Sequence, residues 1–270
     1  MTSTPYDIWA TAIQAARTRL NDRVETLAAD SGKLLDLAQP HVQRMCSNAF
    51  RKLQEFLADR KYSGLEQEVT FINVPAVATT DPLIQVKLGY DAYVDGVNPW
   101  VVFALPQTLI RPYQLWERLT GTTNILTELD EILNGLPSVP KLNWNRQWEW
   151  RDDVLYMPGA LVAIDLRMRY GAYFADPADN APAAATPWYG QIIPILRAMD
   201  PLVDYICREV AIAREDTDGA VGFQQSAEAG ARLIVGRDSN QAQATQSPAQ
   251  LGKMRDAYVA KEGEPRTVKR

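Results

Sequence analysis

The sequence predicts an α+β protein that is mainly α. Amphipathic helical patterns occupy both ends of the 270-residue chain, and runs of alternating apolar and polar residues lie between them. We expect a helical bundle from the N- and C-terminal helices, a small antiparallel β insertion and an extended C-terminal arm. The predicted regions are 1–64 for the N-terminal helices, 65–190 for the β-rich insertion with short helices, 191–240 for the C-terminal helices and 241–270 for the arm.

Two helical patterns form the predicted N-terminal region. Apolar residues recur at helical spacing over residues 6–20, and a second pattern spans 31–60 with Ser31 as a candidate N-cap. Pro40 lies inside the second pattern, so we expect a break there that gives two consecutive helices. His41 is the only histidine, and its position beside this proline favours a structural or exposed residue over a catalytic one.

The middle of the chain changes character after Gly64. β-branched residues over 69–77 and 83–88 predict short strands, and 101–104 predicts another. Pro106 and Pro112 interrupt residues 105–123, so we expect short turns there instead of a long helix. A short helical piece is expected over 124–135.

Residues 142–174 are predicted to form one small antiparallel sheet with an apolar face. Successive side chains alternate over 142–150 and again over 161–170, and Pro158-Gly159 is a turn signal between them. Val154–Tyr156 adds a short apolar run before this turn. The first alternating run places on one face Leu142, Trp144, Arg146, Trp148 and Trp150.

The C-terminal part begins after an Ala/Pro-rich loop at 175–187. A helix is predicted from about residue 200, with Asp200 as its cap and Pro201 at its first position, and another over 222–240. The arm is rich in glutamine and poor in apolar residues, so it cannot offset its own ordering entropy. We expect it to become ordered against a partner.

Composition and charge restrict the possible partners. The net charge is −5, yet the residues from Arg237 onward hold seven basic and four acidic side chains, which leaves −8 on the preceding part. Such an acidic body is unsuited to broad nucleic-acid binding. No apolar run reaches the roughly 20 residues of a membrane span, so we expect no membrane. A secretory signal is not visible, and Cys46 and Cys207 fall in helical patterns, which predicts reduced thiols in a protein made in a cytosol.

The search for catalytic motifs leaves few candidates. The sequence contains no phosphate-binding loop, dinucleotide fingerprint, CxxC or HExxH motif, and we predict no cofactor. Asp152, Asp153 and Asp165 are the candidates for a magnesium site, although adjacent Asp residues are also typical of turns and solvated charge. The tryptophans at 144, 148 and 150 suit either stacking of bases or sugars, or core and subunit contacts. Arg167 and Arg169 suit ion pairs with Glu149 or with a neighbouring subunit.

Five segments, in order, resemble the head-to-tail adaptor, or connector, of the neck of tailed bacteriophages. They are AARTRLND (15–22), LLDLAQPHVQRMCSNAFRKLQEFL (34–57), LPQTLIRPYQLWERLTG (105–121), WEWRDDVLYMPGALVAIDLRMRY (148–170) and RLIVGRDSNQAQ (232–243). The order of LWERLTG, WEW and DLRMRY carries the resemblance, which covers most of the chain.

The resemblance implies a structural virion protein without catalytic residues. Such adaptors form a ring, usually a dodecamer, under the portal protein, and they extend the DNA channel towards a tail, stopper or nozzle protein. DNA passes through this channel without specific binding. The expected location is the virion neck, after synthesis and assembly in the host cytoplasm.

Particular residues are expected to make these contacts. Candidates for subunit contacts are Trp144, Trp148, Trp150, Arg167 and Arg169. The portal-binding arm is expected to use Gln241, Gln243, Gln246, Met254, Tyr258, Val259, Arg266, Lys269 and Arg270. The alternatives are another tail or baseplate attachment module, or a metal-dependent enzyme acting through Asp152, Asp153 and Asp165.

Overall fold

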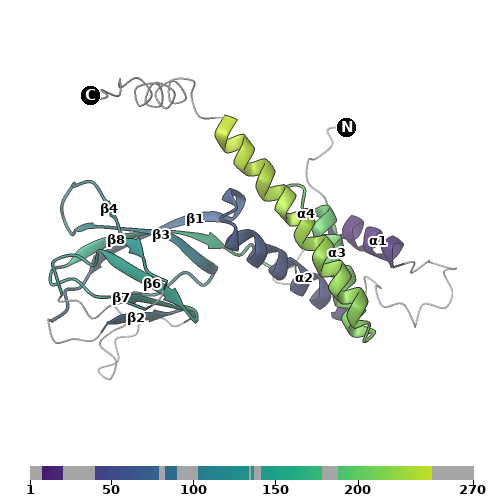
Figure 1. The fold of residues 1–270 in the computed structure, drawn as a ribbon, viewed down its shortest axis with the longest axis horizontal. Helices are drawn as coiled ribbons and strands as arrows, with labels where there is room; N and C mark the ends of the chain where they lie inside the picture. Colours follow the sequence, from purple (N-terminus) through teal and green to yellow (C-terminus); the bar gives the residue numbers. More distant parts are fainter. Residues whose placement is uncertain are drawn as a thin grey trace, which may run out of the picture.

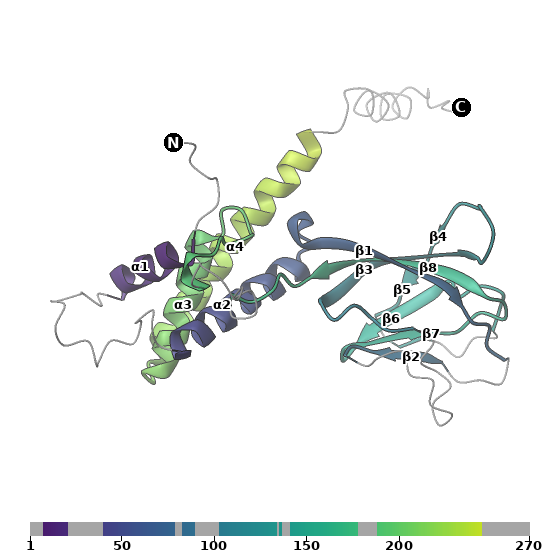
Figure 2. The same cartoon turned by 180° about the vertical axis from the view of Figure 1, so that it is seen from behind.

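A computed structural model of the chain describes residues 8–20, 40–78, 83–89, 103–133, 135–136, 141–177 and 188–244. These residues form four α-helices and eight strands, and the strands make two four-stranded sheets. The helices lie at one end of an elongated molecule and the sheets at the other (Figures 1 and 2). The prediction of a mainly helical bundle with a small β insertion is therefore wrong, because the strands form two substantial sheets beside the helices.

The predicted helices near both ends are confirmed. They are α1 (Trp9–Arg19), α2 (Pro40–Asp59), α3 (Met199–Ala213) and α4 (Thr217–Ala244). Helix α2 begins at Pro40, the residue at which the break was predicted, and the first turn of a helix needs no N–H from its first residue. The segment 31–39, with the proposed cap Ser31, lies outside the described residues. Helix α4 is longer than predicted, because it begins five residues earlier and continues to Ala244.

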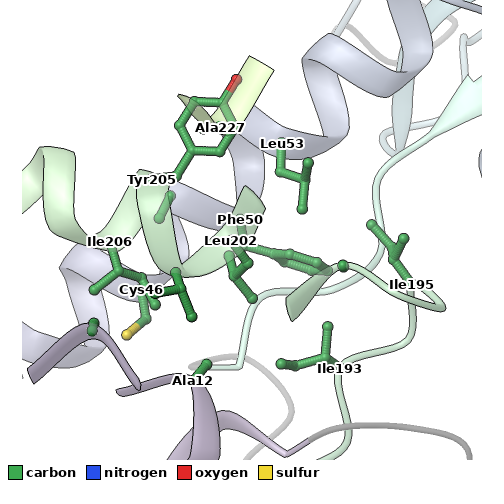
Figure 3. Packing of buried hydrophobic residues seen from close by; sticks show 14 of the residues in the cluster. Ala12, Cys46, Phe50, Leu53, Ile193, Ile195, Leu202, Tyr205, Ile206 and Ala227 are labelled. Atoms are coloured by element: carbon green, nitrogen blue, oxygen red, sulfur yellow. The ribbon is translucent and has the colours of Figure 1, made fainter. Parts of the chain in front are cut away.

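Helix α3 is the centre of the helical end. It contacts α1, α2 and α4, and the four helices enclose one apolar cluster (Figure 3). Phe50 of α2 meets Trp9 of α1 edge to face, with ring centroids 5.3 Å apart. Ala227 and Ala231 are fully buried, and such small side chains let the backbone of α4 lie close to the neighbouring helices.

The first sheet has the order β1-β8-β3-β4, and every neighbouring pair is antiparallel. Its strands are β1 (Glu66–Val74), β8 (Ile164–Ala172), β3 (Leu109–Leu119) and β4 (Thr127–Glu128). On β8, Leu166, Met168 and Tyr170 are buried, while Arg167 and Arg169 alternate with them. The alternation predicted for this strand is confirmed.

The second sheet has the order β2-β7-β6-β5. It contains β2 (Ile84–Lys87), β7 (Val154–Met157), β6 (Gln147–Arg151) and β5 (Asp130–Glu131), of which β5 and β6 are parallel. A second apolar cluster includes buried side chains from both sheets, so the sheets form a sandwich around it. Two short 3₁₀ turns, η1 (Ser63–Leu65) and η2 (Trp188–Gly190), complete the described elements.

The turns predicted for 105–123 and the helix predicted for 124–135 are wrong. These residues form β3, β4 and β5 instead. Strand β3 tolerates Pro112 because its pairing with β8 shifts register between Pro112 and Gln114. Beyond this shift, Tyr113, Leu115 and Glu117 alternate as buried residues in strand fashion. The strand predicted at 101–104 also fails at 103–104, which lie outside any strand, while 101–102 are outside the described residues.

The single sheet predicted for 142–174 is also wrong. β6 and β7 form a hairpin through Asp152 and Asp153, whose φ angles of 53° and 59° match a two-residue type I′ turn. β8 then pairs with β1 and β3 in the other sheet. Pro158-Gly159 therefore lies in a connection between two sheets. Residues 142–146 precede β6 and break the predicted alternation.

The helical end and the sandwich meet where α2 reaches β3 and β8. Gly171 lies against Tyr113 and Ala58, and an added Cβ would lie 3.0 Å from Tyr113 Cζ and 3.1 Å from Ala58 Cβ. Nearby, the backbone N–H of Phe174 donates a 2.6 Å hydrogen bond to Oε1 of the fully buried Gln54. The close contacts of Gly171 with Tyr113 and Ala58 leave no room for a side chain at residue 171.

Candidate functional site

The three aspartates considered for a metal site lie apart in the fold. Asp152 and Asp153 form the β6–β7 turn of the second sheet, whereas Asp165 is buried on β8 of the first. Among the described residues, no group of three or more His, Cys, Asp or Glu side chains is placed to hold a metal ion.

Asp165 has a complete set of protein partners. Its carboxylate accepts hydrogen bonds from Asn73 N at 3.1 Å, Thr120 Oγ1 at 3.0 Å and Arg118 Nε at 3.1 Å. Burial raises the pKa of Asp165, but these hydrogen bonds and the charge of Arg118 outweigh it, so the net pKa lies below the ordinary 3.8. The residue therefore ties β8 to β1 and to the end of β3 as a charged group.

The three tryptophans occupy different environments. Trp148 is 1% exposed and belongs to the sandwich core. Trp150 is half-buried against the same core, and Trp144 lines a cavity beside β4 and β5. Among these three candidates for subunit contact, Trp148 is therefore covered by its own chain.

The solvent-facing side of the first sheet carries alternating rows of charge. Arg167 pairs with Glu68, and Arg169 pairs with Glu66, so the proposed pairing with Glu149 is wrong. Glu149 is buried and instead lies 3.3 Å from Arg151. We call the region formed by Glu66, Glu68, Trp116, Ile125, Arg167 and Arg169 the outer sheet face.

The outer sheet face combines features that are common in protein contacts. The guanidinium of Arg167 lies 5.9 Å from the ring centroid of Trp116, and Ile125 beside it is 93% exposed. A shallow cavity of about 450 Å³ is lined here by residues that include Leu126. Tryptophan, arginine and exposed aliphatic groups in one patch are typical of interface hot spots.

A second cavity, of about 360 Å³, lies beside β3, β4 and β5 and is called here the Trp144 pocket. Its lining consists of Glu117, Thr127, Glu128, Asp130, Trp144 and Arg146. Glu117 is 2% exposed, whereas Glu128 and Asp130 are exposed at the rim. The pocket thus presents carboxylates around a half-buried indole.

A third cavity, of about 380 Å³, lies where the helices meet the sandwich. It is lined by residues that include Arg51, Glu55, Tyr173 and Asp176. Arg51 Nε donates a 2.7 Å hydrogen bond to Asp176 Oδ2, and Tyr173 Oη donates one of 2.8 Å to Glu55. These polar groups are paired with one another, which favours a structural role at the junction.

The arm begins further along than predicted. Gln241 and Gln243 belong to the last turn of α4, which ends at Ala244. The other predicted portal-binding residues, Gln246, Met254, Tyr258, Val259, Arg266, Lys269 and Arg270, lie outside the described residues. At 28 residues, α4 is about 42 Å long, and its C-terminal half extends beyond the other helices (Figures 1 and 2).

Two other predictions concern single residues. Asp200 does not cap α3: the N-cap is Ala198, and Asp200 accepts a 3.3 Å hydrogen bond from Arg19 of α1. Cys46 and Cys207 are fully buried, and desolvation raises the pKa of both thiols to about 12. The thiols are therefore protonated and inert at neutral pH.

No protein-family profile matches the chain, and a search of curated proteins finds no similar sequence. None of the described helices combines the length and apolarity needed to cross a membrane.

Sequence reasoning missed Glu117 and Ile125, which lie in the region interpreted as turns and a short helix. It expected Trp116 to point inward from a short turn, whereas Trp116 is partly exposed and lines the cavity of the outer sheet face. The alternation of Tyr113, Leu115 and Glu117 with Gln114 and Trp116 was the available signal, and the two prolines obscured it.

Proposed function

We propose that this chain is a structural subunit of a tailed-phage virion, a head-to-tail adaptor that forms a ring under the portal. The observation that carries the proposal is the path of α4. The C-terminal half of this helix extends beyond the other helices and ends at Ala244, where the sequence of the glutamine-rich, basic arm begins. The ordered set of five segments that resembles the adaptor family supports the same role.

The helical end and the sandwich have separate tasks in this proposal. The arm docks on the portal protein, while the body continues the DNA channel and meets a tail, stopper or nozzle protein below. The net charge of −8 before Arg237 suits a channel wall along which DNA passes without adhering. A dodecameric ring needs two different surfaces that meet head to tail and close.

The outer sheet face is the proposed contact between subunits. Arg167 and Arg169 are each about half exposed at the side chain, and Ile125 protrudes beside them. Trp144 and Trp150 flank the sandwich as further contacts. Burial of an aromatic and aliphatic cluster with arginine pairs is the usual source of interface energy.

Native mass spectrometry and negative-stain imaging of the purified chain, alone and with its cognate portal, test this proposal. We expect rings, either spontaneous or formed on the portal. Ile125→Asp and Arg167→Ala should weaken them, while Val221→Asp, at a 56% exposed position on α4, should not. A chain that stays monomeric at every concentration and in the presence of the portal contradicts the proposal.

Removal of residues 245–270 tests the role of the arm. Since the described helices and sheets end at Ala244, the truncated chain should melt like the complete one but fail to bind the portal. Unchanged portal binding contradicts the arm assignment. Binding to a tail or baseplate protein without any binding to a portal would favour the alternative of another attachment module.

A further inference from the structure

One buried acidic side chain lacks the counter-charge that the others have. Among the described residues, the buried acids are Glu117, Glu149, Asp165, Asp176 and Asp204. The last four each form an ion pair with an arginine: Glu149 with Arg151, Asp165 with Arg118, Asp176 with Arg51 and Asp204 with Arg19. Within the described part of the chain, Glu117 has no lysine or arginine within ion-pair distance. Buried charges are normally paired, because desolvation is costly.

The contacts of Glu117 are neutral hydrogen bonds. Its carboxylate accepts from Asn145 N at 2.8 Å, Asn145 Nδ2 at 3.3 Å and Arg146 N at 3.1 Å. A carboxylate offers about four acceptor positions, so capacity for one further donor remains. The side chain also lines the Trp144 pocket, which gives an external donor access to it.

The Trp144 pocket has the chemistry of a site for a cation. Glu117, Glu128 and Asp130 contribute three carboxylates, against the single guanidinium of Arg146. The half-buried indole of Trp144 adds an aromatic face, on which an ammonium or guanidinium group binds favourably. A lysine or arginine side chain fits a cavity of about 360 Å³ with this lining.

We propose that the Trp144 pocket binds a lysine or arginine of the chain's own basic segment, residues 253–270. This segment carries Lys253, Arg255, Lys261, Arg266, Lys269 and Arg270 against three acidic residues, so its charge is complementary to the pocket. The 26 residues that follow Ala244 can extend about 85 Å, and we assign the segment to the pocket of its own copy.

The inference goes beyond the proposed function, because it concerns the unassembled chain and needs neither a ring nor a portal. In the unassembled protein, the segment is held against the sandwich by an exchangeable contact. Any acidic partner of the arm then has to displace the segment from this pocket. Failure of portal docking would leave the pocket contact intact, and the two results are separately measurable.

Fluorescence anisotropy of the full-length chain tests the proposal. A dye is attached to Ala257→Cys, and the buried thiols of Cys46 and Cys207 leave this cysteine as the reactive position. The pocket variant Glu128→Gln/Asp130→Asn should lower the anisotropy of the dye, and high salt should do the same in the native chain. Glu215→Gln/Asp218→Asn removes equal charge from exposed positions away from the pocket and should change nothing.

Two further measurements distinguish loss of the contact between segment and pocket from partial unfolding of the pocket variant. Neutralising the six basic residues of the segment to glutamine leaves the described fold untouched and should give the same low anisotropy. Trypsin should cleave the segment about fivefold faster in the pocket variant than in the control variant. Equal anisotropy and equal cleavage rates in the native chain and both double variants would overturn the proposal.

Discussion

At the scale of single residues, the contribution of Asp165 to the stability of the fold depends on pH. Its folded-state pKa is below the ordinary 3.8 because hydrogen bonds and Arg118 outweigh burial, so its contribution is present above that value and lost as pH falls through the folded pKa. We expect Asp165→Asn to lower the free energy of unfolding by about 2 kcal/mol at neutral pH. The difference from the native chain should shrink in urea titrations near pH 3. An equal difference at both pH values would contradict the charged role.

The β6–β7 turn gives a second prediction at this scale. Asp153 has a φ of 59°, which aspartate adopts more readily than a β-branched residue. We expect Asp153→Val to destabilise the chain by about 1–2 kcal/mol, whereas Asp153→Gly should be neutral or stabilising. Urea denaturation measures both changes.

The same turn residues decide the magnesium hypothesis. If Asp152 and Asp153 serve only the turn, the melting temperature of the native chain is independent of magnesium. The melting temperature of the double variant Asp152→Asn/Asp153→Asn is then independent of magnesium as well. Stabilisation by magnesium that disappears in this double variant would support the enzymatic alternative instead.

At the scale of elements, two glycines test different effects. Substitution of Gly171 tests a close contact between elements, and substitution of Gly222 tests helix propensity. A Cβ at Gly171 would press on Tyr113 and Ala58 where the helical end meets the sandwich, so Gly171→Ala should cost about 1–3 kcal/mol. On α4, Gly222 has open space around the position of a Cβ, and Gly222→Ala should stabilise by about 0.5–1 kcal/mol. Thermal melts of the two variants should therefore shift in opposite directions, and a shared direction would contradict the described junction.

The two apolar clusters give a prediction at the scale of the whole molecule. Leu53 belongs to the helical cluster and Leu166 to the sandwich. We expect denaturation in more than one step, with Leu53→Ala lowering the helical transition and Leu166→Ala the sandwich transition, by about 2–5 kcal/mol each. Far-ultraviolet circular dichroism follows the helices, and tryptophan fluorescence follows both parts. A single transition shifted equally by both variants would show instead that the clusters unfold together.

The sequence by itself determined the helices and the alternation of β8. In α2 and α3 the apolar stripe repeats at helical spacing, and in β8 polar and apolar residues alternate without interruption. Such a periodicity can be recognised from the sequence of one element, because it follows from the backbone geometry of that element alone. Cys46 and Cys207 were likewise recognised as helical residues with buried, unpaired thiols.

Only the tertiary structure decided how the strands pair and which charges meet. β3 was hidden because Pro112 and a register shift interrupt its alternation, and β6, β7 and β8 were assigned to one sheet although they divide between two. Strand pairing depends on contacts between residues far apart in the sequence, so no local pattern specifies it. For the same reason the partners of Arg167 and the unpaired buried charge of Glu117 became visible only when distant strands were brought together.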